Sequence, residues 1–343
     1  MRAAKVTYYK KAFFLLLAAI FFLTLSACTK KDKTNRKNQQ DNSFESDRLI
    51  LGFSQIGSES AWRTRNTQSI FEAAEENNVQ IIFDDAQQKQ ENQLKAIRSF
   101  IVYQVDVIAF VPIVETGWDN VLREAKEAGI PVIVVDRQID ADESLYAGFL
   151  GENGFEEGYS AAFFLTQKCK KRTSRINIVE FSGTENSSVA TERANGFRSL
   201  IQTDPKFYIV HSEDGDFLRS RGKEMMDRIL HDNRGLYLNG EPIDVIYSHN
   251  DSMTLGLLDS LEENGISSRN VIIISIDAEQ KCIDALVAGK LNCVVECNPN
   301  LGPTLMELVK KIHAGEEIPR VTYMLETIFT ENDDFSTYTP RGY

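Results

Sequence analysis

The chain of 343 residues carries 50 Asp and Glu against 38 Lys and Arg, a formal net charge of −12. Nine of the basic but only three of the acidic residues lie in the first 46 positions, which leaves the remainder at a net charge of −18. A surface this acidic repels phosphate backbones, so nucleic acid is excluded as the expected partner.

The first 27 residues have the pattern of a secretory signal. Basic residues within positions 1–11 precede an apolar stretch over 12–25, and the small residues Ser26 and Ala27 follow. The apolar stretch is shorter than the roughly 20 residues that a transmembrane helix needs. We therefore expect residues 1–27 to be a signal peptide that is removed on export.

Cys28 directly follows Leu-Ser-Ala, which resembles the lipobox of bacterial lipoproteins. That resemblance implies cleavage before Cys28, a lipid on its thiol and an extracytoplasmic location, periplasmic or on the outer face of the cell membrane. Residues 28–47 contain almost no apolar side chains and cannot form a core, which indicates a flexible tether. The alternative is an ordinary signal peptide that happens to contain a cysteine.

From residue 49 onward, short β-branched runs alternate with longer amphipathic segments. Several runs are apolar at consecutive positions, as in PVIVVD and VIIISID, which is typical of parallel strands covered on both faces. Strands are expected over 49–54, 79–84, 105–112, 132–136, 176–181, 245–248 and 271–277. Helices are expected over 67–77, 90–103, 118–128, 188–202 and 253–264. The pattern predicts an α/β fold with two doubly wound parallel-sheet lobes, which bind ligands beyond the carboxyl ends of their strands.

Polar and aromatic side chains recur where the predicted strands end. Trp62 and Arg63 are expected in the loop after the first strand, and Phe217 is a further aromatic candidate. Carboxylates, carboxamides and guanidinium groups can grip pairs of sugar hydroxyls, and a flat aromatic ring can cover the C–H face of a sugar. The candidate binding residues are Ser54, Gln55, Glu59, Trp62, Arg63, Asp136, Arg137, Arg193, Phe217, Asn250, Asp277 and either Asn298 or Asn300.

Some of these side chains have a simpler interpretation. Asp136, Asn250 and Asp277 could each cap the helix that follows, Arg193 could be a solvated helix residue, and Trp62 could pack on a neighbouring helix. Recurrence of one class of residue at six strand ends favours a binding site over capping alone.

At these positions the chain resembles the type I periplasmic sugar-binding proteins of ABC importers, in the pentose/hexose group and near its galactofuranose-binding members. The segments that carry the resemblance include GFSQIGSESAWR, QQKQENQLKAIRSF and SSVATERANGF, and it extends from about Leu49 to Tyr343. It implies ligand contacts at Arg63, Asp136, Arg137, Arg193, Asn250 and Asp277, with aromatic walls at Trp62 and Phe217. Ser54, Gln55, Glu59 and Asn300 are carried over less specifically.

The resemblance also implies how the chain is divided and with what it interacts. It implies an N-terminal lobe of residues 48–150 plus 301–325, a C-terminal lobe of 151–300 plus 326–343, and three crossings near 150, 300 and 325. The lobes would close on a monosaccharide and present the closed form to a membrane permease. We expect a monomer that binds a galactofuranose-like or other compact aldose.

The alternative functions are those of an enzyme, a DNA-binding regulator and a signalling receptor. The chain lacks the serine hydrolase, zinc protease and P-loop motifs, and Arg137 and Arg193 would keep Asp136 and Asp277 ionised, so an enzyme is not expected. A lactose-repressor-type regulator shares this fold but begins with a DNA-binding motif, where this chain has a signal peptide. A receptor that reports a sugar or signal molecule to a sensor kinase remains open.

No cofactor or metal is expected, because the acidic segment at 213–217 lacks the spacing of a calcium loop. Cys169, Cys282, Cys293 and Cys297 are too sparse for a disulfide scaffold. Buried free thiols, or one disulfide among them, are expected.

Overall fold

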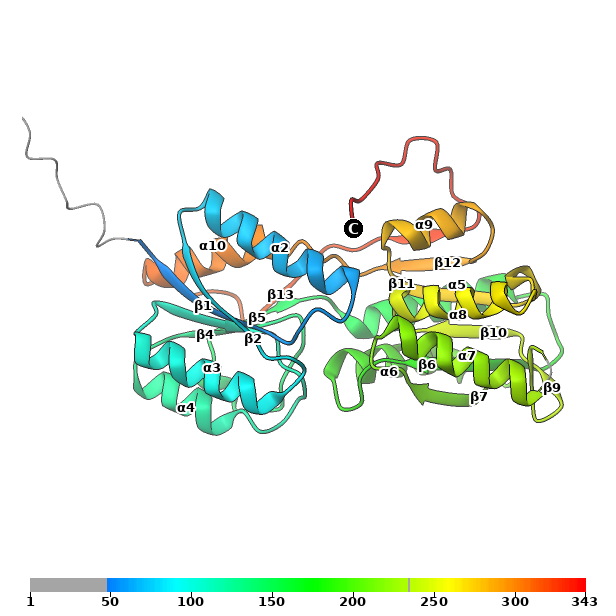
Figure 1. Ribbon diagram of the computed structural model, residues 1–343, viewed down its shortest axis with the longest axis horizontal. Coiled ribbons are helices and arrows are strands. Elements are labelled where there is room, and N and C mark those ends of the chain that lie inside the picture. Colours follow the sequence, from blue (N-terminus) through cyan, green and yellow to red (C-terminus); the bar gives the residue numbers. More distant parts are fainter. Residues whose placement is uncertain (1–47, 234) are drawn as a thin grey trace, which may run out of the picture. The chain divides into compact units, whose positions relative to one another are not determined.

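Two six-stranded sheets organise the part of the chain that the structure describes (Figure 1). The computed structural model describes residues 48–233 and 235–343. The predicted signal peptide and tether, together with Cys28, lie outside the described residues. Within the described ranges, no helix is both long and apolar enough to cross a membrane.

The first sheet has the order β13-β5-β4-β3-β1-β2, and all of its neighbouring strands are parallel. Its strands are β1 (Ile50–Gln55), β2 (Gln80–Asp85), β3 (Val107–Phe110), β4 (Val132–Val135), β5 (Gly148–Gly151) and β13 (Val321–Tyr323). Its helices are α2 (Ala61–Glu76), α3 (Gln90–Tyr103), α4 (Asp119–Glu127) and α10 (Gly302–His313). β1, β3 and β4 are almost fully buried, as expected for parallel strands with helices on both faces.

The second sheet repeats this arrangement in the order β14-β12-β11-β10-β6-β7. Its strands are β6 (Ile176–Ser182), β7 (Phe207–Asp214), β10 (Val245–Ser248), β11 (Ile272–Asp277), β12 (Cys293–Glu296) and β14 (Ile328–Thr330), of which only β14 pairs antiparallel. Its helices are α5 (Gly154–Lys168), α6 (Ser188–Ile201), α7 (Arg219–Asn233), α8 (Asp251–Glu263) and α9 (Gln280–Val287). Two short strands, β8 (Tyr237–Leu238) and β9 (Glu241–Pro242), form a separate hairpin.

The predicted α/β class with two doubly wound, largely parallel sheets is confirmed. All seven expected strands are present, whereas β5, β7, β8, β9, β12, β13 and β14 were not among them. β13 and β14 have three residues each, and β7 is an edge strand with half of its side chains exposed or partly exposed polar groups, so none shows a continuous apolar run.

The first helix begins earlier than the predicted 67–77 segment. Ser60 caps it by accepting a hydrogen bond from the Arg63 backbone N–H at 3.0 Å. The expectation that Trp62 and Arg63 lie in a loop was therefore wrong, because both belong to the first turn of α2. Their helical backbone fixes the direction in which both side chains point.

α5 and α6 approach each other unusually closely. A Cβ atom on Gly196 would lie 2.0 Å from the Phe155 carbonyl oxygen, and one on Gly158 would lie 2.1 Å from the Arg193 carbonyl oxygen. Glycine is therefore required at both positions. This close approach places Arg193 of α6 beside Glu157 of α5.

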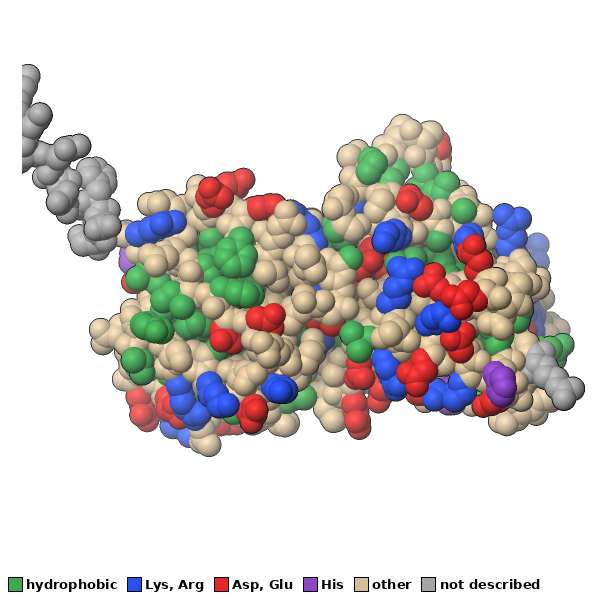
Figure 2. Space-filling view, in the orientation of Figure 1, with side chains coloured by type: hydrophobic (Ala, Val, Ile, Leu, Met, Phe, Trp, Pro, Cys, Tyr) green, Lys and Arg blue, Asp and Glu red, His purple; other side chains and the backbone are tan. Residues whose placement is uncertain are grey.

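The chain passes between the two sheets three times, at residues 152–153, 297–301 and 324–327, which we call the hinge segments. How the chain divides into moving lobes at 150, 300 and 325 stays a prediction. On the face shown in Figure 2, acidic and basic side chains are interspersed. Exposed ion pairs of this kind include Arg98–Glu124 and Arg219–Asp259.

Candidate functional site

A cavity lies where the carboxyl ends of the strands of both sheets meet. It is small in this structure, with a volume of about 30 Å³, well below the roughly 300–1,000 Å³ typical of ligand pockets. It is lined by Glu59, Ser60, Trp62, Arg63, Asp136, Arg137, Val189, Arg193, Phe217, Asn250, Asp277 and Cys297.

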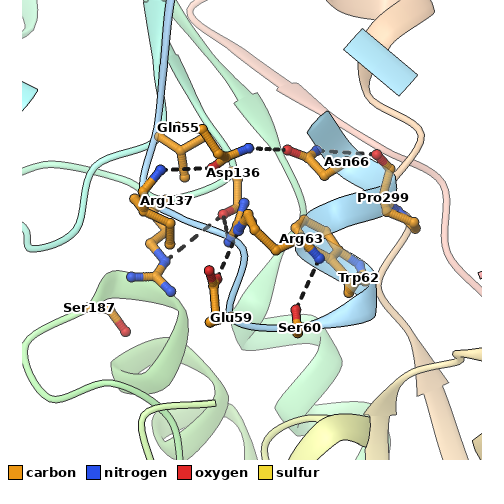
Figure 3. Close-up of polar contacts among 12 residues, drawn as sticks. Gln55, Glu59, Ser60, Trp62, Arg63, Asn66, Asp136, Arg137, Ser187 and Pro299 are labelled. Atoms are coloured by element: carbon orange, nitrogen blue, oxygen red, sulfur yellow. Dashed lines mark hydrogen bonds and ion pairs between the residues drawn. The ribbon is translucent and has the colours of Figure 1, made fainter. Parts of the chain in front are cut away.

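Arg63 is held on the wall of this cavity by two carboxylates (Figure 3). Its Nε donates to Glu59 at 2.9 Å and its Nη2 to Asp136 at 2.7 Å, while Nη1 has no hydrogen-bond partner among the described residues. Burial opposes the charged form, but the carboxylates of Asp136 and Glu59 outweigh it and raise the pKa of Arg63. The guanidinium is therefore charged, oriented and left with one buried N–H₂ group to offer a ligand.

Arg137 lies beside Arg63 and Asp136, but its positive charge has fewer close acceptors than that of Arg63. Its Nη1 donates to the Ile113 carbonyl at 3.1 Å, and its Nε is 3.9 Å from Asp136. Burial and the neighbouring Arg63 charge lower the pKa of Arg137 to about 10. It remains a cation at neutral pH, and an oxygen atom of a ligand could accept a further hydrogen bond from it.

Arg193 provides a third guanidinium, from the second sheet's side. It donates to Glu157 at 2.6 Å and to the His249 carbonyl at 2.6 Å, and it lies 3.8 Å from Asp277. Burial raises the pKa of the Asp277 carboxyl well above its usual value, although Arg193 opposes this shift. The expectation that Arg193 keeps Asp277 ionised was therefore wrong, because burial outweighs the arginine. Asp277 can act in the cavity as a hydrogen-bond donor or as an acceptor, depending on its protonation.

Phe217 places its ring between two of these cations. The guanidinium carbons of Arg137 and Arg193 lie 5.4 Å and 5.9 Å from the ring centroid. Gly183 makes room for the ring, since a Cβ there would lie 2.0 Å from it. Phe217 is thus a rigid apolar wall.

Trp62 connects the two sides of the cavity. Its indole N–H donates to the Cys297 carbonyl at 2.7 Å, and its backbone N–H donates to Glu279 at 3.2 Å. Its side chain is only 4% exposed and packs with a core cluster that otherwise consists mainly of second-sheet residues. One residue of α2 therefore lines the cavity and also joins α2 to the opposite sheet.

Further contacts cross between the two sides near Gln138. Its backbone N–H donates to Ser188 at 2.8 Å and its side-chain amide to Glu192 at 2.9 Å. The backbone N–H of Glu115 donates to the Asn186 carbonyl at 3.2 Å. These contacts, together with those of Trp62, hold the two walls of the cavity together.

Nine of the sequence-predicted residues line the cavity: Glu59, Trp62, Arg63, Asp136, Arg137, Arg193, Phe217, Asn250 and Asp277. Asn250 also fits the capping interpretation, because its oxygen caps α8 through the Met253 N–H and its amide N–H₂ donates to the Phe217 carbonyl. Its two polar atoms are thus already engaged within the protein.

The other three predicted residues lie away from the lining. The Gln55 amide nitrogen donates to Asn66 and Thr67, and Ser54 is fully buried within β1. Asn300 accepts a hydrogen bond from Arg65 and donates to Asn298, so both asparagines belong to a hinge segment outside the lining.

Three lining residues were not predicted: Ser60, Val189 and Cys297. Ser60 was recognisable as a possible helix cap, and Cys297 directly follows the run NCVVE, where the candidates Asn298 and Asn300 were preferred. Val189 follows Ser187, the N-cap of α6, and carries no polar signal in the sequence.

Comparison with known proteins gives consistent results. Residues 51–317 match the model of the periplasmic binding protein domain. The galactofuranose-binding protein YtfQ of Escherichia coli is 38% identical over 301 residues, which cover 86% of this chain and 93% of YtfQ.

Two solved structures are also similar. A Mycobacterium smegmatis protein in complex with β-D-fucofuranose is 44% identical, with a TM-score of 0.78, and the match covers 82% of this chain and 91% of that one. The binding protein of an arabinose ABC transporter from Shewanella sp. ANA-3, bound to α- and β-L-arabinofuranose, is 37% identical, with a TM-score of 0.77 and coverage of 82% and 92%. The chain therefore belongs to the periplasmic binding protein family, whose members are substrate-binding proteins and not enzymes.

Proposed function

We propose that this chain is the extracytoplasmic substrate-binding protein of an ABC importer and that it binds one monosaccharide in its furanose form. The observation that carries the proposal is the small cavity lined by three guanidinium groups and three carboxylates drawn from both sides. Sugar hydroxyls are donors and acceptors at once, and such a lining can satisfy both roles.

The preference for a furanose rests on the relatives. Their names and bound ligands are galactofuranose, β-D-fucofuranose and L-arabinofuranose, which differ in substituents but share the five-membered ring. The small cavity, lined by side chains from both sheets, suits one compact sugar and not an oligosaccharide. We infer that ring form, more than any one substituent, is what this site selects.

Within this proposal, Arg63 is the principal anchor. Its free Nη1 group donates to a ring substituent, while Asp136 accepts from a neighbouring hydroxyl on the same side of the sugar. Arg193 and Asp277 do the same from the opposite side, and Trp62 and Phe217 cover the ring. A ligand that contacts both sides stabilises the closed form over the open one and shifts the population towards it.

The proposed moving bodies are the lobes 48–150 plus 301–325 and 151–300 plus 326–343, with the closed form recognised by a membrane permease. We further propose that Cys28 is lipidated after removal of residues 1–27, which would anchor the protein at the membrane surface. Metabolic labelling with a radioactive fatty acid tests this: label should enter the wild-type chain and be absent from Cys28→Ala.

Calorimetry and NMR together test the binding function. A soluble form beginning at Asp47 is titrated with D-galactose, D-fucose and L-arabinose, with D-glucose as the control. The C1 carbon of each binding sugar is then labelled with ¹³C, and the chemical shift of the bound anomeric carbon reports its ring form. One-site binding with a furanose shift supports the proposal; folded protein that binds no sugar, or binds only a pyranose, overturns it.

A further inference from the structure

Each hinge segment places one potential ligand group in the same buried region. Glu152 comes from the first segment, Cys297 from the second and Glu326 from the third, while Glu157 lies in the first turn of α5. Three possible ligand atoms lie within 4.8 Å of one another: one carboxylate oxygen each of Glu157 and Glu326, and the sulfur of Cys297. These four side chains are called the hinge cluster below.

Several carboxylate oxygens of the hinge cluster have no hydrogen-bond donor from outside the cluster among the described residues. Glu152 is only 5% exposed, yet neither of its carboxylate oxygens has a hydrogen-bond partner among the described residues. Glu157 is 1% exposed; its Oε2 is bound by Arg193, but no described group donates to its Oε1. Glu326 Oε1 is likewise buried without a donor from outside the cluster, although the Glu326 and Glu157 carboxyl groups can share one hydrogen bond when one of them is protonated. Leaving a buried polar atom unpaired costs about 1–3 kcal/mol, and more if it is charged, so these atoms require a partner.

The surrounding charges do not supply that partner. Arg193 contacts Glu157 and lies near Asp277, while the nearby Asp136 carboxylate is engaged by Arg63. The cluster therefore has an excess of acidic groups, which either protons or a metal cation must neutralise.

We propose that the hinge cluster binds one divalent transition-metal ion of the Zn²⁺ type, through Glu157 Oε1, the Glu326 carboxylate and Cys297 Sγ. Glu152 serves as a fourth ligand or accepts a hydrogen bond from a metal-bound water. Zn²⁺ prefers four ligands drawn from thiolate, imidazole and carboxylate groups, with bonds of about 2.0–2.3 Å. Ligand atoms already within 4.8 Å of one another need only small side-chain adjustments to reach that geometry.

The thiol determines the class of metal. Ca²⁺ and Mg²⁺ take oxygen ligands, whereas a thiolate beside carboxylates favours a softer ion such as Zn²⁺. Metal binding deprotonates the thiol and neutralises the carboxylates, so that the acidic groups of the cluster no longer repel one another. Because the ligands come from two hinge segments and α5, the ion would tie the crossings between the sheets together.

Cobalt substitution tests the proposal directly, because a thiolate bound to Co²⁺ gives a charge-transfer absorption in the near ultraviolet. The full chain, purified in mild detergent, reduced and freed of metal, is titrated with Co²⁺ and then with Zn²⁺. We expect the absorption to saturate at one equivalent and to be displaced by Zn²⁺. Cys297→Ala should abolish it, whereas Cys293→Ala, a buried thiol outside the cluster, should leave it unchanged.

A second variant keeps the test valid if Cys297→Ala does not fold. Glu326 is only partly buried, and Glu326→Gln should fold and weaken Zn²⁺ binding at least about tenfold. Folded wild-type protein that shows no saturable charge-transfer absorption overturns the proposal, as does an absorption that survives Cys297→Ala. Either result means that protons alone neutralise the cluster. Sugar titration of the same samples is a separate readout, so failure of the metal site and failure of sugar binding are distinguished.

Discussion

Asp136 and Asp277 occupy equivalent places in the two sheets. Asp136 follows β4 and Asp277 ends β11, the third strand in each sheet order, and both have a positive φ, 62° and 124°. Each carboxylate also faces an arginine. Asp136 lies 2.7 Å from Arg63 of α2, the helix that follows β1, and Asp277 lies 3.8 Å from Arg193 of α6, the helix that follows β6. β1 and β6 are each the fifth strand in their sheet order. The cavity is thus lined by two related Arg/Asp pairs, and the positive φ values turn both carboxylates towards it at some cost in backbone strain.

Arg63→Lys should weaken sugar binding by at least about tenfold, or about 1.4 kcal/mol. A lysine ammonium keeps the charge but cannot reach Glu59 and Asp136 and still offer a third donor in a fixed plane. Calorimetric titration with the sugar that binds wild type best measures the loss. Arg98→Lys, in an exposed ion pair with Glu124, is the control and should bind as wild type does. Equal affinities for all three proteins would remove Arg63 from the site.

Trp62→Phe should lower sugar affinity by about 5- to 30-fold, because the closed form loses a hydrogen bond and leaves the Cys297 carbonyl unpaired, a cost of about 1–2 kcal/mol. Trp118→Phe is the matched control, since Trp118 also donates its indole N–H to a backbone carbonyl, that of Val114, but within one side of the cavity. It should lower thermal stability and leave sugar affinity unchanged. Similar losses of affinity in both variants would contradict the role of Trp62 in closure.

Sugar binding should strengthen as pH falls from 8 to 6, through Glu192. Burial, with repulsion from Glu157 and Glu115, raises the pKa of Glu192 to about 7 in this structure, which we assign to the proposed closed form, although the Gly154 N–H and Arg193 oppose the shift. Opening separates Glu192 from Glu115, which comes from the other side of the cavity, and returns its pKa towards the ordinary value.

A carboxyl whose pKa is raised in the closed form favours that form below its ordinary pKa, and this advantage is lost as pH rises through about 7. The affinity gain between pH 8 and pH 6 should reach about tenfold if opening fully restores the ordinary pKa. Glu192→Gln should flatten the profile, and Glu156→Gln, which is exposed on α5, should not. A wild-type profile that is flat, or that rises with pH, would refute this assignment.

Gly196→Ala should lower the free energy of unfolding by about 3 kcal/mol or more, because the added methyl would lie 2.0 Å from the Phe155 carbonyl oxygen and neither backbone can yield easily. Gly315→Ala provides the comparison. Its φ of 77° carries a cost of about 1–2 kcal/mol, but nothing lies within 4 Å of the new Cβ. Urea unfolding of both variants distinguishes the two costs, and equal losses would argue against tight α5–α6 packing.

Much of the fold could be predicted from local sequence. Runs such as PVIVVD are buried on both faces, so their apolar character is continuous and easily recognised, and seven strands were located in this way. Edge strands are exposed on one side and carry mixed residues, as in β7, or are too short to show a period, as in β13 and β14. For them the decisive interaction is pairing with a distant strand, which no local pattern records.

The candidate site was predicted by class of residue more reliably than by the role of each residue. Polar residues at strand ends were recognisable because parallel strands bring their carboxyl ends to one edge, and seven of the predicted polar residues line the cavity beside Trp62 and Phe217. Gln55 and Asn300 have the same chemical character, but their side chains are already bonded within the protein, to Asn66 and to Arg65. Trp62 was expected in a loop because the capping role of Ser60 was not recognised.

The sequence by itself determined the α/β class, the acidic surface and the set of charged side chains at the strand ends, since these follow from periodicity and composition. Tertiary structure alone decided which of those side chains share a cavity, that Trp62 bridges its two sides, and that Glu157, Cys297 and Glu326 meet at the hinge. Those ligand groups are separated by 29 to 169 positions along the chain, and only the three crossings between the sheets bring them together.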